Sequence, residues 1–277
     1  MLLSYLMWRS SCPVHTSPHK LGKDYGTLLK KIPHSVILRA IILKSPPHLP
    51  SMHPHTTWIV IAAYNEETMI GSVVASVLPI VAHIVVVDDH SRDNTLVAAR
   101  AAGAHAIRHP INLGQGAALR TGMDYALAHG ADVIVHFDAD GQHNSAEIEY
   151  VVRPILEGGA DIVLGSRFLK EGSNVPALRR AVLQGGILFT WLLSGVKLTD
   201  THNGFRALSR HAAQTIRIHQ NRMAHASEII DEIARHGLRY TEVPVTITYS
   251  DYSMARGQSS LNAARIAGQM LWSKLTS

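Results

Sequence analysis

The chain has 277 residues, of which 46% are hydrophobic and 17% charged, so it is long enough to bury a sizeable core. Its single cysteine, Cys12, excludes a disulfide framework and argues against a cysteine-based zinc site. The net charge of +5 arises in residues 1–50, where seven Lys or Arg and one Asp give +6; the remainder stands at −1, so we expect no nucleic-acid partner.

Residues 1–56 are rich in proline and histidine and show little hydrophobic periodicity, which predicts a poorly ordered basic extension. The first dozen residues are not a convincing signal peptide, because Arg9 and Cys12 closely follow a brief apolar run. Alternatively, Met52 is the native start, and mass spectrometry of the N-terminus would decide between the two.

From residue 57 onward, short apolar runs alternate with segments of helical spacing. The predicted strands lie at 58–62, 84–87, 105–109, 133–137 and 161–165. The predicted helices that follow the first four strands lie at 66–78, 93–102, 115–129 and 145–157. This alternation predicts an α/β domain over 57–277, with a mostly parallel sheet flanked by helices.

After Arg167 the pattern becomes less regular. The apolar segment 177–193 is shorter than the roughly 20 residues of a membrane span, and we interpret it as a buried helix in preference to one on a membrane surface. Strands are predicted at 204–208 and 240–249, and helices at 210–218, 228–236 and 262–275.

Acidic side chains follow three of the predicted strands, in the segments 65–67, 88–89 and 138–140. Because the carboxyl ends of parallel strands meet at one edge of a sheet, we expect these side chains to converge there. Carboxylate oxygens suit Mg²⁺ or Mn²⁺, and a shared cation would relieve the repulsion between Asp138 and Asp140. For Asp138-Ala-Asp140-Gly alone, a solvated turn is an equal alternative.

Eight motifs in order resemble those of family 2 glycosyltransferases, especially the polyprenyl-phosphate branch of dolichol-phosphate mannose synthase-like enzymes. The motifs are AAYNEE at 62–67, VDDHSRDNT at 87–95, NLGQGAALRTG at 112–122, DADGQH at 138–143, GSR at 165–167, DTHNGFR at 200–206, EVPV at 242–245 and RGQS at 256–259. Each motif alone is weak, but their order and spacing over roughly residues 57–260 are specific. The chain departs from residues common in the family at three positions. Ala63 stands where Pro is common, His90 where Gly or Asn is common, and Gln115 where Lys is common.

The resemblance implies a GT-A (Rossmann-like) fold and an inverting transfer of sugar from a nucleotide-sugar donor. It assigns Asp138 and Asp140 to the metal, and either Asp88 or Asp89 to the base or ribose. The residues that it places around the nucleotide sugar are Ala62, Tyr64, Glu66, Asp88, Asp89, Asp138 and Gln142.

The acceptor implied by this branch is a polyprenyl phosphate or a cell-envelope glycan, and its chemistry decides which other residues are needed. A hydroxyl acceptor requires a general base, for which Glu228 and Asp200 are candidates. A phosphate acceptor is already anionic and needs cations instead. The candidates for that role are Arg167, Arg206, Arg222 and Arg256. Structural alternatives are a favourable helix-dipole position for Glu228 and an Arg206–Asp200 ion pair.

We therefore expect a cytoplasmic enzyme, working at the inner face of the membrane either by itself or through a membrane partner protein. One alternative is a sugar-phosphate nucleotidyltransferase, although that class usually has a glycine-rich loop with a basic residue where this chain has residues 63–66. The other is a non-catalytic nucleotide-sugar-binding scaffold, which the complete acidic set argues against.

Overall fold

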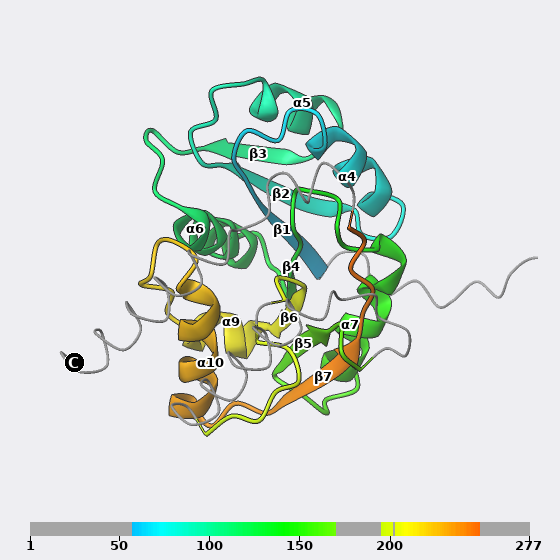
Figure 1. Cartoon of the computed structure of the whole chain (residues 1–277), viewed down its shortest axis with the longest axis vertical. Coiled ribbons are helices and arrows are strands. Elements are labelled where there is room, and N and C mark those ends of the chain that lie inside the picture. The colour runs from blue at the N-terminus through cyan, green and yellow to red at the C-terminus, as the bar shows by residue number, and fades with distance from the viewer. Residues whose placement is uncertain (1–56, 170–194, 202, 250–277) are drawn as a thin grey trace, which may run out of the picture. The chain divides into compact units, whose positions relative to one another are not determined.

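The computed structural model describes residues 57–169, 195–201 and 203–249, all within the unit Met52–Ser277 (Figure 1). The predicted extension at 1–56, the predicted helices at 177–193 and 262–275, and Arg256 lie outside the described residues.

The described residues form a seven-stranded sheet with the order β3-β2-β1-β4-β6-β5-β7. Its strands are β1 (Thr57–Ala63), β2 (His83–Asp88), β3 (His105–Arg108), β4 (Val133–His136), β5 (Ile162–Ser166), β6 (Arg206–Ser209) and β7 (Tyr240–Pro244). Only β6 within this sheet runs antiparallel to its neighbours, β4 and β5. The prediction of a mostly parallel α/β sheet is confirmed.

Helices cover both faces of the sheet and bury two separate apolar layers. The helices are α4 (Ile70–Val77), α5 (Thr95–Ala101), α6 (Gln115–Ala128), α7 (Ile148–Leu156), α9 (Arg210–Thr215) and α10 (His225–His236), with a 3₁₀ turn η1 (Ser145–Glu147) before α7. Apolar residues of α4, α5 and α7 belong to one layer, and those of α6, α9 and α10 belong to the other. Figure 1 shows α6, α9 and α10 together on one side of the sheet. No helix of the described residues is long and apolar enough to cross a membrane.

Alternating side chains of the central strands supply both layers. Along β4, Val133 and Val135 face the α4/α7 layer, whereas Ile134 faces the α6/α10 layer. A strand buried on both faces reads as a continuous apolar run, which is why the sequence predicted it well. The same alternation turns His136 towards the α6/α10 side.

Two predicted boundaries differ most from the structure. The helix predicted from Glu66 begins at Ile70, because the Glu66 backbone N–H donates to Thr95 Oγ1 at 2.8 Å and holds the intervening residues in a turn. The strand predicted to reach Tyr249 ends at Pro244. Beyond it the chain crosses to the 142–143 loop, where Ile247 forms an isolated bridge with His143 and the Thr248 N–H donates to the Gln142 carbonyl.

Candidate functional site

Asp138 lies just beyond the end of β4, where its carboxylate is held from two sides. The Nε2 atom of His143 lies 2.9 Å from Asp138 Oδ2. On another side, the backbone of Gly204 is so close that an added Cβ would stand 2.5 Å from the same oxygen. The Asp138 side chain is nevertheless 29% exposed, so part of the carboxylate remains open to a ligand.

Asp140 completes a pair of carboxylates whose ionisation is opposed. Burial, and then the charge of Asp138, raise the pKa of Asp140, while the backbone N–H of Gln142 donates to its Oδ1 at 3.0 Å. For Asp138, burial acts to raise the pKa, but His143 and then Arg206 outweigh it and lower the pKa. Asp138 is therefore ionised beside an acid that resists ionisation.

This charge arrangement fits a divalent cation. The charge of Glu66, which is 9% exposed, adds to the forces that raise the pKa of Asp140. A dication among these carboxylates would remove the repulsion that their oxygens exert on one another. The described residues contain no cluster of three or more His, Cys, Asp or Glu that could hold a metal by itself, so the fit rests on the Asp138–Asp140 pair.

Behind Asp138 lies a buried group of basic side chains. His136 pairs in register with Arg206 across β4 and β6, and His225 approaches from the first turn of α10. Burial, followed by the charge of Arg206, lowers the pKa of His136 to about 3 and that of His225 to about 4. Burial also lowers the pKa of Arg206, to about 10, which leaves it cationic at neutral pH. Among the described residues, both ring nitrogens of His136 and the Nη1 of Arg206 are buried and have no hydrogen-bond partner.

A second charged unit lies at the end of β5. Arg167 donates to Asp200 Oδ2 from its backbone N–H at 3.2 Å and from Nε at 2.6 Å, and its Nη1 donates to the Tyr249 hydroxyl at 3.1 Å. Burial acts to lower the pKa of Arg167, but Asp200 outweighs it and raises the pKa. Asp200 is therefore the partner of Arg167, and Arg206 donates instead from Nε to the Asn203 carbonyl at 3.0 Å.

The loop that carries Asp200 is itself fastened to β7. The backbone N–H groups of Thr199 and Asp200 donate to the carboxylate of Glu242, at distances between 2.8 and 3.1 Å. Three of the sequence motifs, at 165–167, 200–206 and 242–245, therefore meet in one hydrogen-bonded assembly that orients Arg167.

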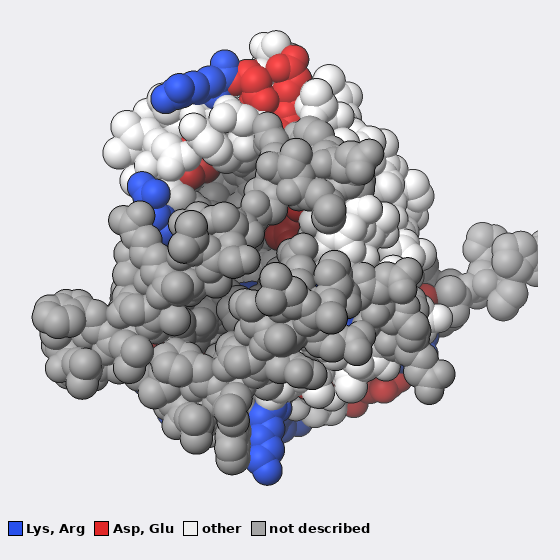
Figure 2. Space-filling model, viewed as in Figure 1, with Lys and Arg blue, Asp and Glu red and all other residues white. Residues whose placement is uncertain are grey.

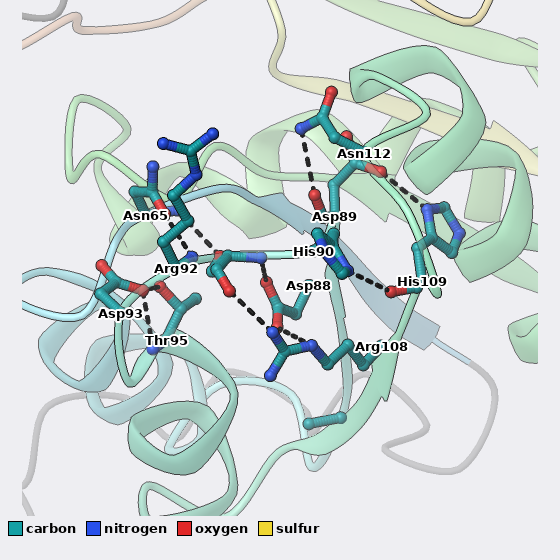
Figure 3. Close-up of polar contacts among 12 residues, drawn as sticks. Asn65, Asp88, Asp89, His90, Arg92, Asp93, Thr95, Arg108, His109 and Asn112 are labelled. Atoms are coloured by element: carbon teal, nitrogen blue, oxygen red, sulfur yellow. Dashed lines mark hydrogen bonds and ion pairs between the residues drawn. The ribbon is translucent and has the colours of Figure 1, made fainter.

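Asp88 and Asp89, at the end of β2, organise neighbouring loops (Figure 3). Asp89 Oδ1 lies 2.8 Å from His109 Nδ1 and accepts from the Leu113 N–H, while Oδ2 accepts from the Gly114 N–H at 2.7 Å. Asp88 is fully buried and accepts from the Ser91 N–H at 2.9 Å, and its other oxygen lies 3.6 Å from Arg108 Nε. Both acids thus have structural partners, and their contact with a base or ribose stays a prediction.

The end of β1 presents the other predicted nucleotide-pocket residues. Ala62 is half-buried and Tyr64 is 40% exposed. Between Tyr64 and Glu66, Asn65 adopts a left-handed φ of 56°, and its Oδ1 accepts from the Arg92 N–H at 2.8 Å (Figure 3). These contacts tie the loops after β1 and β2 to each other.

Glu228 fastens a loop in the described structure. Helix α10 begins at His225, so Glu228 lies in its first turn, and its carboxylate accepts from the N–H groups of His219 and Gln220 at 2.8–3.0 Å. That loop packs on the start of α6, where the Ala117 N–H donates to the Asn221 carbonyl at 3.2 Å. These contacts tie Glu228 to the preceding loop and do not cap the helix, whose N-cap Ala224 has no side-chain hydrogen bond. The role of Glu228 as a base stays a prediction. Arg222, in the same loop, is exposed.

The structure thus brings Glu66, Asp138 and Asp140 together, with Arg206 and the Arg167–Asp200 pair nearby in the β4–β6–β5 part of the sheet. Two residues at this site were missing from the prediction, His143 and Gly204. Both lie inside motifs that the sequence showed, but nothing in sequence spacing says that they touch Asp138. On the face seen in Figure 2, the Lys and Arg side chains of the described residues form separate small groups and no continuous basic field.

Comparison with known proteins supplies the family. Residues 58–217 match the glycosyl transferase family 2 description. A UDP-N-acetylglucosamine–dolichyl-phosphate N-acetylglucosaminyltransferase of Methanococcus voltae is 33% identical, over 79% of this chain and 96% of its own length. A polyprenol monophosphomannose synthase of Mycolicibacterium smegmatis is 29% identical, over 74% of this chain and 82% of its own.

Solved structures agree on the fold. Glucosyl-3-phosphoglycerate synthase from Mycobacterium tuberculosis, crystallised with Mn²⁺, UDP-glucose and phosphoglyceric acid, superposes with a TM-score of 0.60 at 22% identity, over 80% of this chain and 79% of that one. The fold is thus the GT-A fold, as predicted. The chain belongs to glycosyl transferase family 2, in its dolichol-phosphate mannose synthase-like branch.

Proposed function

We propose that the chain transfers a sugar from a nucleotide-diphosphate sugar to a polyprenyl phosphate, with inversion at the anomeric carbon. The observation that carries the proposal is the Asp138–Asp140 pair, two carboxylates at the end of a central strand whose charges oppose each other. Such a pair is costly unless a cation and its ligand use it. The conclusion agrees with the names of the relatives, which transfer sugars to dolichyl or polyprenyl phosphates.

Asp138 and Asp140 would hold Mg²⁺ or Mn²⁺, with Gln142 adjacent. When bound, the ion would neutralise charge that develops on the departing diphosphate. Structural neighbours have been crystallised with Mn²⁺ or Mg²⁺ and UDP, which supports this use of the fold. Asp138 is prepared for the role because His143 and Arg206 keep it ionised.

In the reaction, an oxygen of the acceptor phosphate attacks the anomeric carbon from the face opposite the diphosphate. The new bond joins that oxygen to the sugar, and the bond from the sugar to the diphosphate oxygen breaks as the nucleoside diphosphate leaves. A phosphate has no proton to lose at this step, so no general base is needed. What it needs is a cation that guides it to the sugar.

Arg167 is the described residue best suited to guide the acceptor. Two of its contacts, to Asp200 and Tyr249, fix the direction of the guanidinium, and a guanidinium group matches phosphate oxygens in shape. Arg222 and Arg256 stay predicted contributors to the same phosphate, and Arg206 would act from behind Asp138. On the donor side, Ala62, Tyr64 and Glu66 line the end of β1, where the nucleotide would bind.

A lipid-linked acceptor requires work at a membrane surface, so we expect peripheral attachment at the inner face, directly or through a membrane partner protein. A thermal-shift screen tests the donor: UDP- and GDP-sugars are added with and without Mn²⁺, since ligands that bind the native state raise the melting temperature. We expect one nucleotide sugar to stabilise the protein only when Mn²⁺ is present.

Product-release assays separate the alternatives. Pyrophosphate release from a nucleoside triphosphate and a sugar phosphate would identify a nucleotidyltransferase. Donor binding without nucleoside diphosphate release, across polyprenyl phosphate and glycan acceptors, would identify a binding scaffold.

A further inference from the structure

His143 lies five positions after Asp138. The family resemblance assigns no role to His143. Its side chain is 2% exposed, and Nε2 contacts Asp138 Oδ2 at 2.9 Å. On another side of the carboxylate lies the Gly204 backbone, which leaves no room for a side chain. The carboxylate of Asp138 is therefore confined by two neighbours that come from different parts of the chain.

The imidazole of His143 is itself held firmly. Its ring lies 5.0 Å from the Phe205 ring at a tilt of 30° and 5.3 Å from the Phe137 ring at 72°, an edge-on contact. Its backbone forms a bridge with Ile247, and the neighbouring Gln142 carbonyl accepts from the Thr248 N–H at 2.9 Å. Because both the ring and its backbone are fixed, the nitrogen that touches Asp138 cannot turn away easily.

We propose that His143 is a positioning residue that holds the Asp138 carboxylate in the orientation needed to bind a divalent cation. The inference rests on the proposed metal site at Asp138 and Asp140. The approach of Nε2 to Oδ2 at 2.9 Å is a close polar contact outside regular hydrogen-bond geometry, since neither ring nitrogen of His143 has a hydrogen-bond partner among the described residues. The Asp138 side chain is 29% exposed, so part of the carboxylate stays open to the ion. Mutation of a side chain that orients a metal ligand in this way typically costs about 10- to 100-fold in metal affinity.

Two substitutions separate the N–H group from the ring. His143→Phe keeps an aromatic ring between Phe137 and Phe205 but has no N–H, whereas His143→Gln places an amide nitrogen near the Nε2 position without a ring. His143→Asn is too short to reach Oδ2 and serves as a second variant without the contact. The matched control is His105→Phe, a histidine that packs on the Trp58 and Tyr125 rings at the opposite end of the sheet.

The measurement is Mn²⁺ binding, followed by the loss of the free-ion electron paramagnetic resonance signal, with melting temperatures recorded for every variant. We expect His143→Phe and His143→Asn to weaken Mn²⁺ binding by roughly 10- to 100-fold. His143→Gln should retain most of the wild-type affinity, and His105→Phe all of it. A role in packing alone predicts the reverse order, with His143→Phe equal to wild type and His143→Gln impaired, and that result would overturn the proposal.

The experiment also separates this inference from the proposed function. If the wild-type protein binds Mn²⁺ and His143→Phe binds it equally well, only the role of His143 is refuted. If the wild-type protein binds no Mn²⁺, alone or with UDP or GDP, the metal site is refuted and the role of His143 with it.

Discussion

The backbone of Gly204 lies directly against the carboxylate of Asp138: a Cβ atom on residue 204 would stand 2.5 Å from Oδ2 and 2.7 Å from Oδ1. The contact arises because β6 runs antiparallel beside β4, so that the residues just before β6 meet those just after β4. Glycine is therefore required here for space, and the position of Asp138 depends on it.

Gly204→Ala should displace the Asp138 carboxylate while leaving the buried strands in place. A misplacement of about 1 Å in a catalytic arrangement can cost about 100-fold in rate, so we expect a loss of that order in turnover. Steady-state kinetics with circular dichroism as the folding check would measure it. Gly71→Ala in α4 is the control, because its Cβ would meet nothing within 4 Å and alanine favours the helix. Equal activity of the two variants would contradict this account.

Asp140→Asn should stabilise the metal-free protein and strongly reduce turnover. The raised pKa of Asp140 means that its charged form is disfavoured in the fold, so wild-type stability falls as pH rises through that pKa. Asparagine removes the charge and can still accept from the Gln142 N–H. A gain of about 1 kcal/mol would raise the melting temperature by about 2–4 °C.

Turnover of Asp140→Asn should fall about 1,000-fold, as the loss of several kcal/mol of charge stabilisation implies. Differential scanning fluorimetry in EDTA measures the expected gain in stability, and a donor-turnover assay measures the expected loss of turnover. Asp132→Asn, which alters an exposed pair with Arg210, is the control and should change neither. A destabilised, active Asp140→Asn protein would refute the electrostatic account of the site.

The buried histidines should make the protein labile to acid. His136, with a pKa of about 3, and His225, with a pKa of about 4, stay neutral in the fold, whereas in the unfolded chain they protonate near pH 6.5. Their contribution to stability is fully present above about pH 6.5 and is lost as pH falls towards those values. Each proton taken up only by the unfolded chain costs about 1.4 kcal/mol per pH unit.

In His136→Leu the unfolded chain takes up one proton fewer. The free energy of unfolding of this variant, measured with urea between pH 6.5 and 4.5, should therefore fall less steeply than that of the wild-type protein. The comparison between the two proteins isolates His136, because the effect of Asp140 is common to both. Parallel curves would mean that His136 is protonated in the folded state.

Glu228→Gln tests whether the acceptor needs a general base. With a polyprenyl phosphate acceptor we expect turnover to stay within about tenfold of wild type, because a base would contribute about 10²–10⁴ and none is required. The melting temperature should fall, since the carboxylate holds the His219 and Gln220 N–H groups. Glu149→Gln, which breaks an exposed pair with Arg153, is the control for loss of a surface carboxylate. A fall of 100-fold or more in the Glu228 variant would restore it as the base.

Much of the fold could be predicted from the sequence because its strands are buried on both faces. Continuous apolar runs such as those of β2 and β4 have few other interpretations, and the glycine that ends α5 marks a helix end directly. The errors occurred where tertiary contacts replaced local preference. Thr95, 29 residues away, caps the Glu66 N–H and delays α4, and the bridge at Ile247 ends the regular pairing of β7.

The site was predictable where charge alone implies function. The convergence of Asp138, Asp140 and Glu66 follows from the parallel topology. Sequence spacing could not reveal which acids have structural partners. Asp89 accepts from a loop N–H group, and Asp200 accepts from Arg167, although nothing in the sequence distinguishes these two acids from Asp138 and Asp140. His90 adopts a left-handed φ of 65°, a conformation that Gly and Asn tolerate best, and the family resemblance led us to expect Gly or Asn at this position.

The most direct test of the central claim is a transfer assay with Asp140→Ala beside the wild-type protein. Each is given the nucleotide sugar that stabilises it best, polyprenyl phosphate in detergent and Mn²⁺, and the lipid-linked sugar and nucleoside diphosphate are measured together. We predict equal amounts of both products from the wild-type protein, none after EDTA, and none from a folded Asp140→Ala variant. Near-normal transfer by Asp140→Ala would contradict the claim that the Asp138–Asp140 pair supports sugar transfer.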